Sequence, residues 1–499
     1  MWIKRSRFFC GGDGLRIYIH GFKLLCGSCL WHADCFHKEK KKHRAGCGKR
    51  STGFPPHKRR NMIRLMMPVS ETGKGFMKRW LLFFVCFWSL LPAGAGAEDL
   101  IRKGETLDLQ RCIAIALERH PGIQAAAGTL RAGESRIGQA RSDYYPQLNG
   151  SAGYSRTDPM SASAGQAYDS YSSSVSLSQN LYDFGKTSTQ VKIQELNRDS
   201  SRSDLDNIRT QVSFGVKQAY FGLLQAGRNR DVSQEVVGQF QQHLDQARAF
   251  FEVGTKPKFD VTKAEVDLSN AKLNLIKAEN AFRLARVALN NAMGMPEAPD
   301  YEVADQLSSQ RVEIDLEETI RKAYDRRPDL KAIAVKRKSL EQSIELARKG
   351  YYPSVSGNAG YGWGGGSFPL DQGWSFGAQL NVPLFSGFLT KYQVAEAQAN
   401  LDVLAANEAS LRQTIYQDVK QAWLNLQEAA DRGATAELIV RQAAENLELA
   451  NGRYASGVGS PIEVTDALVA VSNAKTAQIS ALYDYKLAQS SLEKAAGEQ

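Results

Sequence analysis

The sequence reads Ser142-Asp143-Tyr144-Tyr145-Pro146 at one point, and 207 positions later it reads Lys349-Gly350-Tyr351-Tyr352-Pro353. Further along, Val216-Lys217-Gln218-Ala219-Tyr220 returns 203 positions later as Val419-Lys420-Gln421-Ala422-Trp423. A repeat of this length indicates that one structural unit has been duplicated, so both copies should carry the same elements in the same order. The change of offset marks a loop between the two strands of a copy that tolerates a change of length.

A signal peptide is predicted at residues 77–97. Lys78 and Arg79 precede an apolar run that is too short to span a membrane, and Ala95-Gly96-Ala97 offers small residues for cleavage. Residues 1–76 show no helical or strand period. We interpret them as a spurious extension that results from a wrongly assigned start codon, with Met77 as the true start.

The alternative for this leader is a zinc module around Cys26 and Cys29. One CxxC pair has the right local spacing, but no second pair follows at the distance that zinc modules use. The leader also holds most of the cysteines. After residue 97 the sequence contains one cysteine, Cys112, and two histidines, His120 and His243. We therefore expect no disulfide framework, no metal site and no cofactor.

The net charge changes sign once residues 1–97 are set aside. The whole chain has 63 Lys and Arg and 53 Asp and Glu, of which the leader holds 19 and 4, so 44 basic and 49 acidic residues remain. The basic character of the chain lies in its leader. We therefore expect no nucleic-acid partner.

Each copy is expected to fold as a helix, two strands, a long helix and a shorter helix, in domains at 98–300 and 301–499. In the first copy, helical patterns cover 108–143 (with a break at 120–122), 186–251 and 259–293, and strand patterns cover 147–154 and 171–182. In the second copy, the helices are expected at 315–350, 388–453 and 462–495, and the strands at 354–361 and 374–385. The hairpin loops are then 155–170 and 362–373.

The long helices carry apolar residues at steps of three and four, as in Leu205, Ile208, Val212 and Val216. Such a seam requires helical partners. At 1.5 Å per residue, the helix over 186–251 would be about 100 Å long. The pattern therefore predicts a long assembly of packed helices.

The strands alternate between apolar and polar residues. Trp374, Phe376 and Leu380 face one way, whereas Ser375 and Gln379 face the other. This pattern is typical of an outer-membrane strand, although a soluble two-sided sheet alternates in the same way. Four strands cannot close a barrel, and lipid does not tolerate open sheet edges. If the strands lie in a membrane, copies of the chain must complete the barrel together.

These features resemble the outer membrane efflux protein family, the TolC-like outer membrane factors, over about 98–497. The resemblance is carried by the duplication, the Tyr-Tyr-Pro segments, the strand exits Leu181-Tyr182-Asp183-Phe184-Gly185 and Val382-Pro383-Leu384-Phe385-Ser386-Gly387, and the turns Phe251-Glu252-Val253-Gly254 and Tyr454-Ala455-Ser456-Gly457. It implies a mainly α protein with membrane β: a long coiled-coil-like helical tunnel plus four β-strands per protomer in a shared trimeric barrel of about twelve strands.

The resemblance also implies a function. The chain would be a homotrimer in the outer membrane with a periplasmic helical extension, in contact with lipid, a periplasmic adaptor (membrane fusion protein) and an inner-membrane transporter. It would be the exit channel of a tripartite efflux pump or of a type I secretion system. The cargo is not implied, because the transporter selects it.

Two other classes of protein are weighed against a channel. A structural coiled-coil protein of the envelope, without channel activity, would explain the helices but not the strand hairpins. An enzyme is not expected, because no carboxylate is spaced meaningfully from a His or a nucleophile, and the sequence has no glycine-rich phosphate loop.

The functional residues of a conduit are expected at its closed end, near 251–263 and 454–466. Glu463 and Asp466 lie one helical turn apart and resemble the paired acids of the family's periplasmic aperture. Repeated around a threefold axis, they would form an acidic ring that favours cations. The other interpretation is an ordinary helix start, where acids suit the helix dipole.

In the family, an Asp of the first tip bonds to a Tyr and an Arg of the second tip and helps to keep the aperture shut. Asp260 and Tyr454 match two of these positions, whereas the Arg position is Gly459 here. We expect that Asp260 and Tyr454 contribute to closure. Gly254 and Gly457 are expected to allow the tight turns that adaptors meet, and simple helix capping is the alternative.

Overall fold

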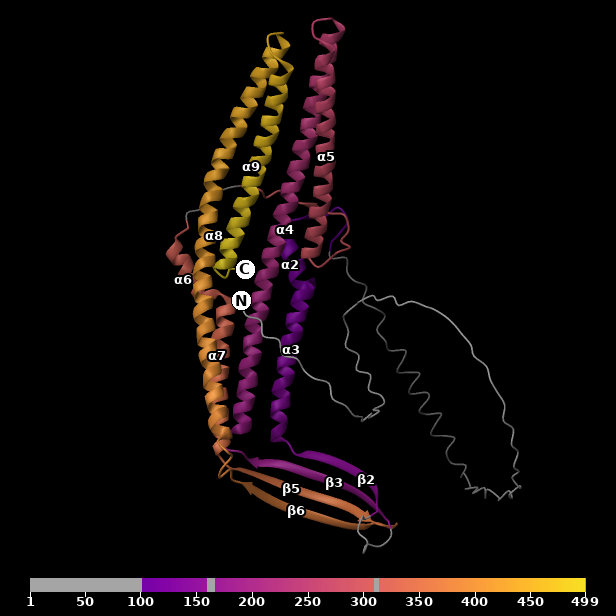
Figure 1. Cartoon of the computed structure of the whole chain (residues 1–499), viewed down its shortest axis with the longest axis vertical. Coiled ribbons are helices and arrows are strands. Elements are labelled where there is room, and N and C mark those ends of the chain that lie inside the picture. The colour runs from indigo at the N-terminus through magenta and orange to yellow at the C-terminus, as the bar shows by residue number, and fades with distance from the viewer. Residues whose placement is uncertain (1–100, 159–166, 309–313, 499) are drawn as a thin grey trace, which may run out of the picture. The chain divides into compact units, whose positions relative to one another are not determined.

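The computed structural model describes residues 101–158, 167–308 and 314–498, which belong to one compact unit. The predicted extension at 1–76, the signal peptide at 77–97 and the zinc alternative lie outside the described residues. Within this unit, the strands lie at one end of the long helices and the turns that join those helices lie at the other (Figure 1). Among the described residues, we find no helix with the length and apolar character needed to cross a membrane.

The two repeats contain the same elements in the same order. The first repeat comprises β1 (Thr106–Leu107), α2 (Leu109–Arg119), α3 (Pro121–Arg141), β2 (Gln147–Thr157), β3 (Tyr168–Tyr182), α4 (Lys186–Glu252) and α5 (Lys258–Ala292). The second comprises β4 (Glu302–Val303), α6 (Leu316–Arg326), α7 (Pro328–Arg348), β5 (Ser354–Gly365), β6 (Asp371–Asn381), α8 (Leu389–Ala455) and α9 (Pro461–Ala495). The four predicted long helices are confirmed.

Proline divides the short helical segment of both repeats. Pro121 begins α3, and the side chain of His120 caps that helix by accepting a hydrogen bond from Gly122 N at 3.1 Å. The segment at 315–350 was predicted without a break, and this was wrong, because Pro328 begins a separate helix there. Proline lacks the N–H that would continue the preceding helix, and its fixed φ suits the first turn of the next.

The four longer strands form one antiparallel sheet in the order β2-β3-β5-β6. Tyr361 pairs directly with Trp374, and directly paired residues project from the same face. The register therefore confirms that the alternating residues build one apolar face. This face carries Leu148, Tyr154, Val175, Leu177, Ala359, Tyr361, Trp374, Phe376 and Leu380. The other face is polar, and on it the hydroxyls of Ser151 and Ser174 are hydrogen-bonded at 2.8 Å.

The ends of the strands differ from the prediction. The strands reach Thr157, Tyr168, Gly365 and Asp371, so the loops predicted at 155–170 and 362–373 are shorter than expected. The last strand was predicted to continue to 385, but it ends at Asn381. Pro383 follows closely, and it has no N–H to donate to a neighbouring strand.

Lysine side chains join the two repeats where the strands meet the long helices. Lys349 Nζ donates to Gly185 O at 2.8 Å and to Thr189 Oγ1 at 2.7 Å, at the start of α4. In the opposite direction, Lys186 Nζ donates to Tyr352 O at 3.1 Å. The second Tyr-Tyr-Pro segment therefore holds the beginning of α4 beside the hairpin of the other repeat.

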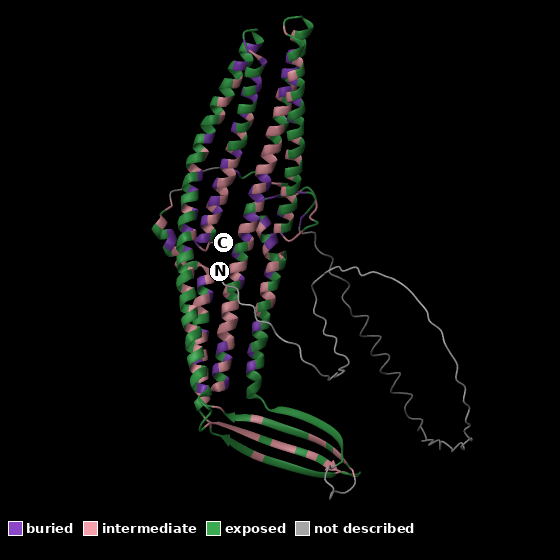
Figure 2. Ribbon diagram, in the orientation of Figure 1, coloured by how far each residue is buried: buried purple, intermediate pink, exposed green. Residues whose placement is uncertain are grey.

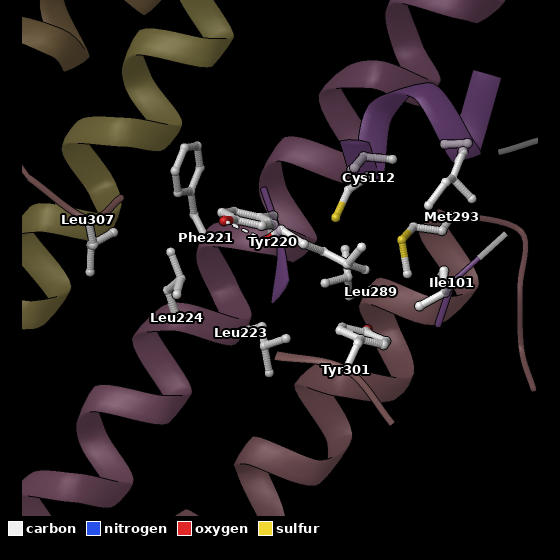
Figure 3. Packing of buried hydrophobic residues seen from close by; sticks show 14 residues of the cluster. Ile101, Cys112, Tyr220, Phe221, Leu223, Leu224, Leu289, Met293, Tyr301 and Leu307 are labelled. Carbon is white, nitrogen blue, oxygen red and sulfur yellow. Dashed lines mark hydrogen bonds between the residues drawn. The ribbon is translucent and has the colours of Figure 1, made fainter. Parts of the chain in front are cut away.

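Each repeat has a hydrophobic core near the middle of its long helix. In the first repeat, Tyr220 of α4 packs with Leu289 and Met293 of α5 and with residues of the short segments before α2 and after α5 (Figure 3). Tyr220 Oη donates to Ala304 O at 2.6 Å and lies 3.4 Å from Leu107 O. The ring fills the core while its hydroxyl supplies a donor to buried backbone carbonyls.

The second repeat contains the equivalent contact. Trp423 Nε1 donates to Ile314 O at 2.9 Å. Trp423 follows Tyr220 by 203 positions, and Ile314 follows Leu107 by 207 positions. Leu107 and Ile314 each precede the aspartate that caps the next helix, which is α2 in the first repeat and α6 in the second. The duplication has therefore preserved this contact with the long helix, although the aromatic donor differs.

Polar contacts along α4 and α9 join the two repeats. Lys217 Nζ lies 2.8 Å from Glu493 Oε2, and Lys475 Nζ lies 2.7 Å from both carboxylate oxygens of Glu235. Buried residues line the facing sides of the helices, whereas the outer sides of α5 and α8 are largely exposed (Figure 2). The interior of the unit therefore lies between the two helical hairpins.

Replacement of Tyr220 by phenylalanine should lower the stability of the helical part. The variant keeps the ring but leaves Ala304 O without its donor, at a cost of about 1–3 kcal/mol. We expect a lower apparent Tm in thermal unfolding followed by circular dichroism. Tyr351→Phe removes a hydroxyl from an exposed ring outside the long helices and should leave the Tm unchanged. Equal Tm values for Tyr220→Phe and the wild type would contradict the importance of this bond.

Candidate functional site at the tips of the helical hairpins

Two tight turns of similar geometry form the tips. Residues 253–257 join α4 to α5, and residues 456–460 join α8 to α9. Gly254 and Gly457 have φ values of 76° and 81°, in the left-handed region that favours glycine. Gly254 N donates to Phe251 O at 2.9 Å, and Gly457 N donates to Tyr454 O at 3.1 Å. The same geometry makes the turn and caps the helix; adaptor docking at these glycines stays a prediction.

Behind the turns, the four long helices share one buried cluster, which we call the tip core. Its buried members are Phe240, Leu244, Ala247, Ala264, Leu268, Ala271, Ala450, Tyr454, Val464, Ala467 and Leu468. Tyr454 is completely buried, and the centre of its ring lies 5.6 Å from that of Phe250 and 5.2 Å from that of His243. A tyrosine of the second hairpin therefore inserts between residues of the first.

The structure brings Asp260 and Tyr454 close together without a hydrogen bond between them. Asp260 is 5% exposed, and Tyr454 Oη is buried with no hydrogen-bond partner among the described residues. Burial raises the pKa of Tyr454, and the charge of Asp260 raises that pKa further. The raised pKa keeps the Tyr454 hydroxyl neutral beside Asp260. The contribution of the two residues to closure stays a prediction.

Position 459 does not accommodate the arginine that the resemblance led us to look for. A Cβ atom on Gly459 would lie 2.8 Å from Tyr454 N and 2.9 Å from Arg453 C, so the backbone would have to move. A different cation lies nearby. Lys256 Nζ, from the first turn, is 3.5 Å from Gly459 O and 5.5 Å from the centre of the Tyr454 ring. The cation near Tyr454 is therefore a lysine of the first hairpin and not an arginine of the second.

The two predicted ring acids are both exposed in the first turns of α9, but their surroundings differ. Glu463 Oε2 forms an ion pair with Arg453 Nε at 3.1 Å. Asp466 forms no ion pair or hydrogen bond with any described residue. Asp466 is therefore the acid that is available to a passing ion, and the ring itself stays a prediction.

The equivalent residues of the first repeat do not present exposed acids. Asp260 is buried, and Lys263 Nζ forms an ion pair with Asp267 at 2.7 Å. Asp267 also accepts a hydrogen bond from Thr465 Oγ1 of α9 at 3.1 Å. In the first repeat Asp260 is therefore buried and Lys263 is paired within α5, whereas in the second repeat both equivalent acids are exposed.

His243 belongs to this site, although the sequence did not single it out. The structure places it in the tip region with 4% exposure. Its Nδ1 is buried and has no hydrogen-bond partner among the described residues. Only its being a histidine could have pointed to a site. Helical periodicity does not show which groups of other helices lie near a given position.

Within the described ranges, no group of three or more His, Cys, Asp or Glu residues is placed to hold a metal ion. Burial raises the pKa of the Cys112 thiol to about 12, so this thiol stays protonated at neutral pH. The tips instead combine two tight turns, a shared apolar core with buried polar groups, and exposed acids. Such an arrangement can hold two hairpins together and present charge to an ion.

The match to known proteins follows the duplication. The family model for outer membrane efflux protein matches residues 112–295 and 319–498, one stretch in each repeat. The chain belongs to the outer membrane efflux protein family. It is 25% identical over 394 residues to the outer membrane protein TolC of Vibrio cholerae, which covers 77% of this chain and 89% of that protein.

Solved structures agree with the fold. The CusC channel superposes with a TM-score of 0.69 at 18% identity, over 82% of this chain and 100% of that one. The open state of the MtrE outer membrane channel of Neisseria gonorrhoeae gives 0.67 at 22% identity, over 81% and 93%. The chain is an outer-membrane efflux channel with a periplasmic helical part. The predicted family, function and location are confirmed, and the envelope coiled-coil alternative is not supported.

Asp260→Ala should make the closed channel open more readily, because it removes the buried carboxylate near Tyr454. The open probability in planar lipid bilayers should rise relative to the wild type. Asp245→Ala, which removes an exposed acid of α4, should behave as the wild type. Unchanged gating of Asp260→Ala would show that the Asp260–Tyr454 pair does not contribute to closure.

Proposed function

We propose that three copies of the chain form a homotrimer whose strands close one barrel in the outer membrane. The sheet carries this proposal, because β2 and β6 are its open edges and one of its faces is apolar. Trp374 and Phe376 on that face are each 79% exposed. Lipid would cover such a face, but it cannot satisfy the backbone groups of an open edge. Pairing of β6 with β2 of the next copy would satisfy both edges.

The helices support the same assembly. Large apolar side chains remain exposed along α5 and α8. They are Phe259, Val266, Leu273, Ile276, Leu284 and Val287 on α5, and Leu389, Tyr392, Val403, Tyr416, Leu424, Leu438, Ile439 and Leu449 on α8. Exposed apolar residues on long helices indicate a surface that another helix covers. In the proposed trimer, α5 and α8 of adjacent copies meet and close the tunnel wall.

The trimer would form the exit of a tripartite efflux pump or of a type I secretion system. A periplasmic adaptor would bind at the turns of Gly254 and Gly457, where the neighbouring Val253 and Val458 are more than 70% exposed and provide apolar contact. An inner-membrane transporter would supply the energy and select the cargo. No catalytic step is required of this chain, because a water-filled passage does no covalent chemistry.

The assembly can be tested directly on outer-membrane fractions. The protein should migrate as a trimer on a gel before heating and as a monomer after heating, and the purified trimer should form discrete conductance steps in a planar bilayer. A monomer in both lanes, or a trimer that does not conduct, would contradict the proposed assembly or the proposed channel, respectively.

Asp466→Asn should reduce the preference of the channel for cations over anions. Three copies of Asp466 would surround the axis, and their removal should lower the permeability ratio of K⁺ to Cl⁻ on the order of twofold. Glu463→Gln should have a smaller effect, because Arg453 already neutralises Glu463. Glu437→Gln, which removes an exposed acid of α8, is the control. Equal ratios for Asp466→Asn and the control would exclude the ring.

A further inference from the structure

We propose that His243 makes the packing of the two helical hairpins sensitive to protons, so that acidification ionises the imidazole and separates α8 from α4 at the tips. The inference concerns the contact itself. Its consequence for gating rests on the proposed function, in which the tips are the closed end of the channel.

The position of the ring supports this role. His243 of α4 lies in the tip region with 4% exposure, and the centre of its ring is 5.2 Å from that of Tyr454 of α8. Tyr454 is completely buried, so it reaches the first hairpin as part of the packing and not as a surface contact. A change at His243 therefore acts on the side chain that joins the two hairpins.

Charged groups of α5 lie near the imidazole, and other charged groups lie at the neighbouring turn and on α9. From α5, Asp267, Asp260 and Lys263 are close enough to influence it, and Asp267 is itself bonded to Lys263 and to Thr465 of α9. From the turn after α4, Lys256 lies over the other ring of the pair, that of Tyr454. The acids of α9 near this site, Glu463 and Asp466, are exposed.

The neutral and the protonated imidazole differ in what they require here. A neutral imidazole has one nitrogen that carries a proton and one that does not. Nδ1 of His243 has no hydrogen-bond partner among the described residues, which suits the nitrogen without a proton. Protonation makes both nitrogens donors. The Nδ1–H would then be a charged donor without an acceptor in the tip core, which is unfavourable unless the ring reaches water.

The direction of the pH effect follows from linkage. Burial lowers the pKa of His243 from its ordinary value of 6.5, and Lys263 lowers it too, while Asp267 and Asp260 act in the opposite direction. A ring exposed by separation of the hairpins would regain the ordinary pKa. The packed state therefore binds fewer protons than the separated state. Its added stability is complete above pH 6.5 and is lost as the pH falls through the lowered pKa of His243.

The proton-sensitive group is confined to one half of the duplication. The position equivalent to His243 is Asn446, which is exposed and has no charge to gain. The other histidine of the described chain, His120, caps α3 and lies outside the tip core. A response of the tips to pH in the range of histidine titration is therefore assigned to a single residue in each copy.

Amide hydrogen exchange of the full-length protein tests the contact. Protection factors, corrected for the intrinsic effect of pH, are compared between about pH 7.5 and about pH 5 for the peptides that cover 236–268 and 447–468. In the wild type, protection of these peptides should fall several-fold on acidification, whereas peptides from the middle of α4 should change little. No selective fall at the tips would overturn the proposal.

Two variants and one control identify the residue. His243→Phe keeps a ring beside Tyr454, and His243→Gln keeps a polar group; neither can be protonated, so both should hold constant protection at the tips. His120→Asn retains an N-cap acceptor and should respond to acid as the wild type does. An acid response that persists in both His243 variants would assign the effect to another group and overturn the proposal.

Conductance separates this inference from the proposed function. If the trimer conducts, its open probability should rise as the pH falls from about 7.5 to about 5 in the wild type and not in His243→Phe. A conducting trimer with the same pH response in both proteins would overturn the inference and leave the channel standing. A protein that never conducts would contradict the proposed function, and the exchange measurements would still decide the inference.

Discussion

A hydrogen bond from an aromatic side chain to the main chain joins each short segment to the middle of its long helix. Tyr220 supplies the donor in the first repeat, and Trp423 supplies it in the second. A helix of 67 residues offers many similar places for a short helix to pack. The buried carbonyls restrict this choice, because they are satisfied where the aromatic donor reaches them. These contacts hold each short segment between the strands at one end of the long helices and the tips at the other.

The two repeats diverge most clearly at the tips. Tyr454 is buried in the tip core, whereas the equivalent Phe251 is 44% exposed. Asp260 is buried, whereas the equivalent Glu463 is exposed and paired with Arg453. The structure thus uses one scaffold in two ways: the second hairpin inserts Tyr454 into the shared tip core, and the first hairpin does not insert the equivalent Phe251. The contact between the two hairpins at the tips is therefore not symmetric, although the chain is duplicated.

Much of the architecture could be predicted because its signals are local. The long helices have no internal proline, and the strands largely alternate between apolar and polar residues, so their types and approximate ends follow from periodicity. The predicted ends of elements were wrong where a single proline interrupts an otherwise regular pattern. Pro328 separates α6 from α7, and Pro383 follows a strand that was predicted to continue. At the tips, the sequence already showed Gly459 at the family's arginine position, and the structure adds that the turn leaves no room for a side chain there.

The sequence by itself determined the duplication, the order of elements, the apolar face of the sheet and the glycines of the turns, since each depends on neighbours along the chain or on a fixed period. Only the tertiary structure showed that His243, Asp260 and Tyr454 share one buried region and that Glu463 is neutralised while Asp466 is free of partners among the described residues. These relations depend on how helices from the two repeats approach one another. That approach is decided by packing between residues about 200 positions apart, which no local pattern records.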